Sequence, residues 1–144
     1  GSYRNGRKHG MFTTHYSNGQ RESTGSYDNE KRQGTYVTWY RNAAKAKSGT
    51  YIKGKLQGQV VEYYANGRPK LDSFMAAGHK HGRHTTYFKS GRRESAADYR
   101  HGKLHGKFTM WAETGRFRAG VCYVDGKQMW ASTEEPEAAL RPCP

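Results

Sequence analysis

The sequence predicts an all-β protein, an elongated repeat array of antiparallel β-hairpins that form one twisted, curved, single-layer sheet. The first supporting observation is a glycine that recurs every 24 residues without insertion, at Gly10, Gly34, Gly58, Gly82 and Gly106. The second is a tyrosine with the same period, at Tyr3, Tyr27, Tyr51, Tyr99 and Tyr123, with Met75 in the fourth place. Strict self-similarity of this kind is typical of architectures in which each repeat packs on its neighbours. No segment shows convincing helical periodicity.

Composition alone favours a disordered chain, because hydrophobic residues make up only 33% of the sequence and the formal net charge is +13. We reject that class because the chain holds three Trp, eleven Tyr and five Phe residues, many at a fixed position in the repeat. Aromatic rings bury large areas and compensate for the few aliphatic side chains. No apolar run in the sequence approaches membrane-spanning length.

Two turn signals divide each repeat into two strands. The first repeat carries Asn5-Gly6 and Asn18-Gly19, and Asn-Gly favours the two-residue type I′ loop, in which both central residues have positive φ. With such loops at both turns, we expect residue 16 to pair with residue 21, and residue 12 with residue 25. The strands between them are then roughly nine to eleven residues long.

Alternation along these strands assigns the side chains to two faces. Face 1 carries the row Phe12, Tyr36, Val60, His84 and Phe108. Glycines lie on the same face, with Gly25 opposite Phe12 and Gly49 opposite Tyr36, where they leave room for the rings. Face 2 carries the row His15, Trp39, Tyr63, Tyr87 and Trp111 among charged side chains. We expect face 1 to be packed and face 2 to be more hydrated.

Both ends of the chain depart from the repeat. Gly1-Ser2 look like a tag scar, so we assign residues 1–2 to the scar, residues 3–130 to five full repeats and one partial repeat, and residues 131–144 to a C-terminal cap or flexible tail. In the partial repeat, Trp130 replaces the recurrent glycine. Cys122 and Cys143 either form a disulfide that ties the tail to the last repeat, as in an exported protein, or stay free thiols, as in a cytosol.

Catalytic, cofactor and metal sites are not expected. His79 and His81 stand at positions that other repeats fill with Arg or Lys and with Gln. Histidines at equivalent positions of adjacent repeats are roughly 10 Å apart, too far to share one ion, which leaves only an adventitious site on His79 and His81 as an alternative. Glu62 and Asp98 likewise occupy ordinary repeat positions. We therefore expect a protein that is not an enzyme and binds no cofactor.

The unit Tyr-x-x-Gly-Lys-x-x-Gly, followed by Phe-x-x-Tyr-Tyr-x-Asn-Gly or a near variant, resembles the MORN repeat, and more closely its bacterial variant. The third copy matches best, with Tyr51-Ile52-Lys53-Gly54-Lys55-Leu56-Gln57-Gly58 and then Tyr63-Tyr64-Ala65-Asn66-Gly67. The likeness covers about residues 3 to 129. It implies stacked hairpins and, as in the YwqK-like group, an antitoxin or immunity protein that binds a toxin. The compartment stays open between bacterial cytoplasm and periplasm.

Positive charge is the feature that the fold does not require, and it follows both edges of the predicted ribbon. Charge of one sign attracts an acidic partner, and Trp, Tyr and Arg dominate protein-binding hot spots. We therefore expect a cognate toxin or effector with an acidic surface to be bound and blocked sterically. The residues expected to bind it are Trp39, Tyr63, Tyr87, Trp111, Arg83, Lys107, Arg118, Arg68, Arg92 and Arg116. The alternatives are binding of anionic lipid headgroups or nucleic acid through the basic edges and aromatic face, and a scaffold or homo-oligomer joined through its terminal strands.

Overall fold

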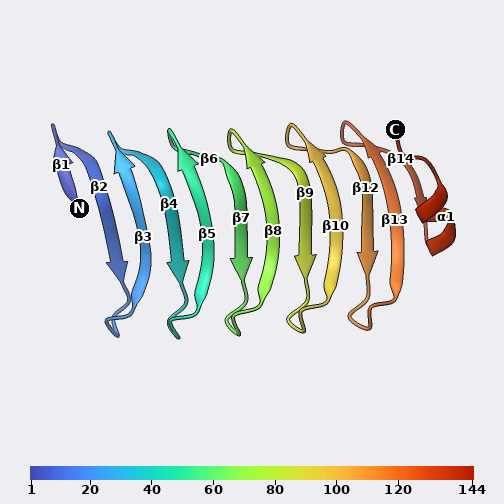
Figure 1. Ribbon diagram of the computed structural model, residues 1–144, viewed down its shortest axis with the longest axis horizontal. Coiled ribbons are helices and arrows are strands. Elements are labelled where there is room, and N and C mark those ends of the chain that lie inside the picture. The colour runs from blue at the N-terminus through green and yellow to red at the C-terminus, as the bar shows by residue number, and fades with distance from the viewer.

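A computed structural model describes all residues from Gly1 to Pro144. The chain forms one open, fourteen-stranded antiparallel sheet whose strands follow one another in sequence order. Hairpin lies beside hairpin along the long axis, with the two chain ends at opposite ends of the array (Figure 1). The predicted all-β architecture of hairpin repeats in a single layer is confirmed.

Apart from the terminal strands β1 and β14, the unbroken strands are eight or nine residues long, slightly shorter than expected. The strands are β1 (Ser2–Arg4), β2 (Arg7–His15), β3 (Arg21–Asp28), β4 (Lys31–Trp39), β5 (Lys45–Ile52), β6 (Lys55–Leu56), β7 (Gly58–Tyr63), β8 (Pro69–Ala76), β9 (His79–Tyr87), β10 (Arg93–Arg100), β11 (Lys103–Leu104), β12 (Gly106–Trp111), β13 (Phe117–Val124) and β14 (Lys127–Ser132). The one helix, α1, spans Glu135–Leu140. With six residues it is far too short to cross a membrane, and the structure has no other helix.

The first turn of every repeat is the predicted two-residue loop. Arg4 pairs with Arg7, and the two residues between them, Asn5 and Gly6, have φ of 51° and 74°. This is the type I′ geometry. It recurs at Asn29-Glu30, Lys53-Gly54, Ala77-Gly78, His101-Gly102 and Asp125-Gly126.

The second turn differs from the prediction. Tyr16 N–H donates to Gln20 C=O at 2.8 Å, and Gly19 N–H donates to Tyr16 C=O at 2.9 Å. The loop therefore has three residues and ends on Gly19, whose φ is 84°. Arg21 pairs with His15 across a β-bulge, so the expected pairing of residues 16 and 21 was wrong, whereas Phe12 does pair with Gly25. The physical reason is that Asn-Gly also suits a type I turn followed by a glycine bulge, a turn in which Asn keeps negative φ.

Side chains at fixed positions bind each repeat to the next. The hydroxyl of Tyr16 donates to the carbonyl of Trp39 at 2.7 Å, and Tyr40 and Tyr64 repeat this bond at the same distance, to the carbonyls of Tyr63 and Tyr87. The amides of Asn18, Asn42 and Asn66 donate to carbonyls in the neighbouring turn. The side-chain Oε1 atoms of Gln33 and Gln57 accept from the backbone N–H groups of Lys53 and Ala77. These bonds explain why the period tolerates no insertion.

Face 1 holds most of the packing. Gly25 lies between Phe12 and Tyr36, and a Cβ there would come within 2.7 Å of the Tyr36 ring. Arg32 lies 4.2 Å from the centre of that ring and donates to the hydroxyls of Tyr27 and Tyr51. The bond to Tyr27 is the main cause of a raised pKa of Arg32. Aromatic rings and the stems of basic side chains thus cover a sheet that has no second layer.

The C-terminal segment folds back onto the sheet. Cys122 and Cys143 form a disulfide, with Cα atoms 5.6 Å apart, which decides between the two alternatives left by the sequence. Buried Cys122, Trp130 and Ala138 make a small apolar cluster. Helix α1, which no periodicity indicated, supplies Ala138 to this cluster.

Candidate binding surface

The predicted aromatic row forms a continuous ladder on face 2. We call Trp39, Tyr63, Tyr87 and Trp111 the aromatic ladder; each is the final residue of its strand, in β4, β7, β9 and β12. All four side chains are half-buried. Equivalent residues lie two strands apart, or about 9.6 Å. Strand periodicity and the constant repeat length therefore place four large rings in one line.

Cationic side chains stack on three of these rings. The guanidinium carbons of Arg21 and Arg93 lie 4.7 Å and 4.8 Å from the ring centres of Trp39 and Trp111. Lys45 Nζ lies 6.0 Å from the ring centre of Tyr63. Pro69, which pairs with Tyr63 across the bulge, occupies the equivalent position in the third repeat.

Arg21, Lys45 and Arg93 follow the second turns, so the sequence predicted them to lie among the charges at the edge of the ribbon. The bulge turns Arg21 onto face 2, so cations alternate with the aromatic rings except between Tyr63 and Tyr87, where Pro69 stands. Exposed cation–π pairs contribute roughly 0.5–1 kcal/mol each. In the sequence, each of these cations precedes its ladder residue by the same number of positions. This spacing predicts a cation–π contact only when the position of the bulge is known.

Two exposed apolar side chains, Met11 in β2 and Phe74 in β8, lie on face 2 outside the aromatic ladder. Met11 is 65% exposed and Phe74 is 45% exposed. Sequence reasoning missed both, because other repeats fill the Met11 position with polar residues and the Phe74 position with Ser26, Thr50, Asp98 and Cys122. Phe74 borders a shallow pocket whose other walls include Gln59, Asp72 and Arg83. The surface therefore offers apolar anchors among polar groups, as protein-binding surfaces do.

The predicted basic residues have different surroundings. Arg83 pairs with Asp98 at 3.1 Å, and Lys107 Nζ donates to the carbonyl of Ala139 at 2.7 Å, so both are already engaged. Arg116 and Arg118 are exposed and form no ion pair.

Two further arginines of the predicted set join neighbouring turns. Arg68 Nη1 donates to the carbonyl of Ser90, and Arg92 Nη1 donates to the carbonyl of Glu113 at 3.1 Å. Their guanidinium groups thus have a structural role between repeats. Of the predicted basic residues, Arg116 and Arg118 are the ones left without an internal partner.

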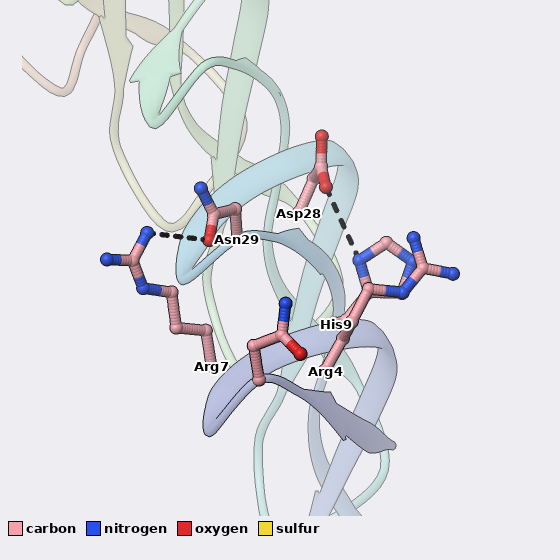
Figure 2. A pocket seen from close by; sticks show the side chains of 6 residues that line it. Arg4, Arg7, His9, Asp28 and Asn29 are labelled. Atoms are coloured by element: carbon pink, nitrogen blue, oxygen red, sulfur yellow. Dashed lines mark hydrogen bonds and ion pairs between the residues drawn. The ribbon is translucent and has the colours of Figure 1, made fainter.

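A polar pocket lies away from the ladder, at the first-turn edge near the N-terminus (Figure 2). Arg7 Nη1 donates to Asn29 Oδ1 at 2.9 Å, and His9 Nδ1 lies 3.3 Å from Asp28 Oδ1. Arg4 also lines this pocket. Arg7 and His9, on the first-turn edge of the sheet, are therefore paired with side chains of the next repeat.

The histidines occupy repeat positions. His105 Nδ1 accepts the N–H of Asp125 at 3.3 Å, in the way that Gln33 and Gln57 accept from the following turn. His81 contacts His101, with ring centres 5.5 Å apart, a neighbour that the sequence had not indicated. No group of three or more His, Cys, Asp or Glu side chains is arranged to hold a metal ion.

One buried polar pair interrupts the apolar row of face 1. His84 Nδ1 lies 2.9 Å from Ser73 Oγ, and the two residues are only 8% and 3% exposed. Burial lowers the pKa of His84, as does the charge of Lys80, while Glu62 acts in the opposite direction. A serine hydroxyl bonded to a histidine is the start of a nucleophilic site, but this pair is closed off from solvent by its own face and fits a packing role.

Protein-family models and curated proteins give no match to this chain. The resemblance to the MORN repeat therefore remains an inference from the residues, and function has to be argued from the surface itself. Rigid aromatic rings, stacked cations and isolated apolar side chains are displayed along an extended face.

Proposed function

We propose that the chain is a non-enzymatic protein-binding module whose partner docks on face 2. The observation that carries this proposal is the aromatic ladder with its stacked cations, displayed on an open face of a single-layer sheet. Large aromatic side chains anchored in a sheet lose little conformational entropy on binding. They and Arg are the residue types that most often dominate binding energy.

The partner is best described as a protein with an acidic surface. The formal net charge of +13 steers a negatively charged partner and speeds its association. Face 2 is also long and open, which suits a broad protein surface better than a small molecule, whose sites are usually enclosed.

The biological form we favour is an antitoxin or immunity protein that silences a bacterial toxin or effector. The resemblance of the repeat to the bacterial MORN variant supports this form. Steric coverage of the active site of the toxin is sufficient for neutralisation, so no chemistry is required from this chain.

The test uses the product of the gene adjacent to this one in the source genome. Co-expression should restore growth if that product is toxic, and the purified proteins should form a stable complex. The double variant Trp39→Ala/Tyr63→Ala should weaken the complex by about 30-fold or more, since loss of a hot spot costs about 2 kcal/mol. Tyr3→Ala is the matched control, because Tyr3 is 64% exposed and lies outside the ladder. Equal affinity of the partner for the unsubstituted chain, the double variant and Tyr3→Ala would rule out docking on face 2.

A polyanion is the second candidate partner, because cations and aromatic rings alternate in one row, an arrangement also used for single-stranded nucleic acid. Binding to an oligonucleotide and to anionic vesicles should be measured at low salt and at about 150 mM salt. We expect weak binding that disappears at the higher salt. Tight binding at 150 mM that is lost in Trp39→Ala/Tyr63→Ala would replace the protein partner with the polyanion.

A further inference from the structure

The C-terminal segment lies on the same face as the aromatic ladder. A Cβ added to Gly120 would come within 2.6 Å of Ala138 Cβ, so α1 sits directly on this glycine. Side chains stand at the equivalent face 2 position in every other repeat, namely Thr24, Ser48, Asp72 and Ala96. Only the last repeat therefore lets a helix approach the backbone so closely.

The segment occupies one end of the ladder. Trp111, Phe117 and Ala138 border a single small cavity of about 110 Å³, and Lys107 Nζ donates to the carbonyl of Ala139. The C-terminal segment thus engages one of the four ladder rings, Trp111, and one of the basic residues expected to bind a partner, Lys107. Trp39, Tyr63 and Tyr87 have no such cover.

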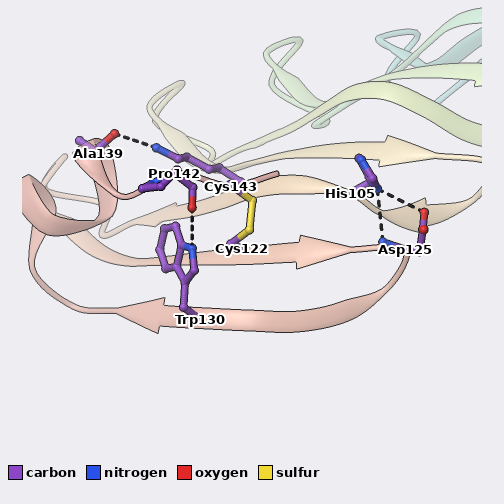
Figure 3. The surroundings of a disulfide bond; sticks show 8 residues. His105, Cys122, Asp125, Trp130, Ala139, Pro142 and Cys143 are labelled. Carbon is purple, nitrogen blue, oxygen red and sulfur yellow. Dashed lines mark hydrogen bonds and ion pairs between the residues drawn. A yellow bond between two sulfur atoms is a disulfide. The ribbon is translucent and has the colours of Figure 1, made fainter.

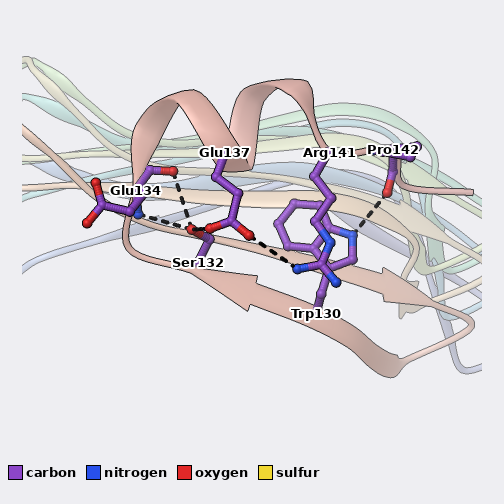
Figure 4. A network of polar contacts seen from close by, with 6 residues as sticks. All are labelled: Trp130, Ser132, Glu134, Glu137, Arg141 and Pro142. Atoms are coloured by element: carbon purple, nitrogen blue, oxygen red, sulfur yellow. Dashed lines mark hydrogen bonds and ion pairs between the residues drawn. The ribbon is translucent and has the colours of Figure 1, made fainter.

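The covering segment has the chemistry that we propose for the partner. It concentrates Glu134, Glu135 and Glu137 in an otherwise basic chain that has only 12 acidic residues. Glu137 accepts from Ser132 Oγ at 2.6 Å and lies 3.5 Å from Arg141 (Figure 4). Glu135 borders the cavity beside Lys107 and Trp111. An acidic segment therefore rests on the basic, aromatic face.

Besides the disulfide (Figure 3), single hydrogen bonds, one stacked arginine and one buried side chain hold this segment in place. Trp130 Nε1 donates to the carbonyl of Pro142 at 3.0 Å, and Arg141 stacks on the Trp130 ring. Ala138 is the one buried residue of α1. A helix this short has no stability of its own in water, so the tether decides whether it stays docked.

We propose that residues 133–144 are an internal occupant of the partner surface, held by the Cys122–Cys143 disulfide and released by a dithiol reductant. The purpose assigned to this release, which is to open the Trp111 end of the ladder to an acidic partner, rests on the function proposed above. Release itself does not depend on that function.

The exchange takes place at Cys143, which is half-buried, whereas Cys122 is fully buried. A thiolate of the dithiol attacks Cys143 Sγ and forms a mixed disulfide, and Cys122 Sγ leaves as a thiolate that takes up a proton. The second thiol of the reductant then displaces Cys143, which leaves as a thiol. The protein disulfide gains two electrons, and the dithiol ends as its own disulfide.

Hydrogen exchange and side-chain oxidation of the full chain, with and without dithiothreitol, test this proposal. The amides of Ala138 and Arg141 bond to the carbonyls of Glu134 and Glu137. Reduction should speed their exchange by about tenfold or more while β2 to β10 stay protected. Oxidative labelling of Trp111 should rise by about twofold or more as its cover leaves, with Trp39 unchanged.

The control is the double variant Cys122→Ser/Cys143→Ser. Its amide exchange and Trp111 oxidation should equal those of the reduced chain and should not change when dithiothreitol is added. Protected α1 amides in the reduced chain, or unfolding of the whole sheet on reduction, would overturn the proposal. No partner is present in this experiment. Its failure therefore leaves docking on Trp39 and Tyr63 untouched, and failure of the complex leaves release of the segment untouched.

Discussion

Tyr16, Tyr40 and Tyr64 show how single side chains set the spacing of the repeats. Each hydroxyl donates to a carbonyl 23 residues further along the chain. The fourth copy has Phe88 at this position, and its hairpin therefore lacks the bond. The hydroxyl positions are visible in the sequence, but their acceptors are not, because the acceptor depends on how adjacent hairpins stack.

Exchange of these side chains gives a matched pair of predictions. Tyr40→Phe should lower the free energy of unfolding by about 1 kcal/mol, the usual net worth of one such bond. Phe88→Tyr should raise it by a similar amount, because the carbonyl of Trp111 stands where the acceptor of Tyr64 stands one repeat earlier. Urea unfolding followed by circular dichroism measures both. An unchanged midpoint for Tyr40→Phe would show that the bond contributes nothing.

Ala43 is the strained member of its set. Its φ is 65°, at the position where the other second turns have glycine, and a side chain in this conformation costs roughly 1–2 kcal/mol. Ala43→Gly should therefore stabilise the protein by about 1 kcal/mol. Ala44→Gly, next in the chain and without positive φ, is the control and should not. Thermal unfolding distinguishes them, and a loss of stability in both variants would contradict this explanation.

His84 makes stability depend on pH. Its pKa is lowered by burial from the ordinary value of 6.5, so the unfolded chain binds a proton more readily than the folded one. The free energy of unfolding should fall as pH drops through 6.5 and be fully restored above it. His84→Phe copies Phe12 and Phe108 and should flatten the curve between about pH 7.5 and 5.5. Denaturant unfolding across this range is the measurement, and parallel curves would exclude His84 as the cause.

At the scale of elements, hairpins were predictable and the C-terminal segment was not. Type I′ turns follow from local sequence, because Asn-Gly accepts positive φ at both places. The conformation of the second turn could not be predicted from the Asn-Gly pair alone. Asn18 accepts from the N–H of Gln20 and donates to the carbonyl of Arg41, and the second of these bonds depends on the next repeat. Helix α1 has six residues and no periodicity, and its docking depends on Gly120, which occupies an ordinary strand position in the repeat. The sequence placed the ladder residues in one row on face 2, as the structure does. The cations stacked on them could not be predicted, because that contact depends on the bulge that turns Arg21 onto face 2.

Gly120→Ala should displace α1, because its new Cβ would come within 2.6 Å of Ala138 Cβ. We expect faster hydrogen exchange at the amides of Ala138 and Arg141 by about tenfold, with the disulfide still closed. Ser48→Ala, at the equivalent face 2 position three repeats earlier in the chain, should leave this exchange unchanged. Unaltered protection of α1 in Gly120→Ala would show that Gly120 does not admit the helix.

The whole molecule is an extended surface with very little interior. Only 13 of its 144 residues are buried, so most side chains of face 2 remain available to a partner. Stability in such an array comes from contacts between neighbouring repeats, which is why tyrosine, asparagine and glutamine bonds between repeats take the place of a large core. The same openness leaves Trp39, Tyr63 and Tyr87 without a second layer, whereas α1 lies beside Trp111.

Radical footprinting of side chains in the complex with the adjacent gene product is the decisive test of docking on face 2, because it distinguishes the two faces of one sheet. Met11, Trp39, Tyr63 and Phe74 lie on face 2, whereas Tyr27 and Tyr51 lie on face 1. We predict that complex formation reduces oxidation of the face 2 residues by about threefold or more and leaves face 1 unchanged. Protection of Tyr27 and Tyr51, with Trp39 and Tyr63 as reactive as in the free protein, would contradict the account.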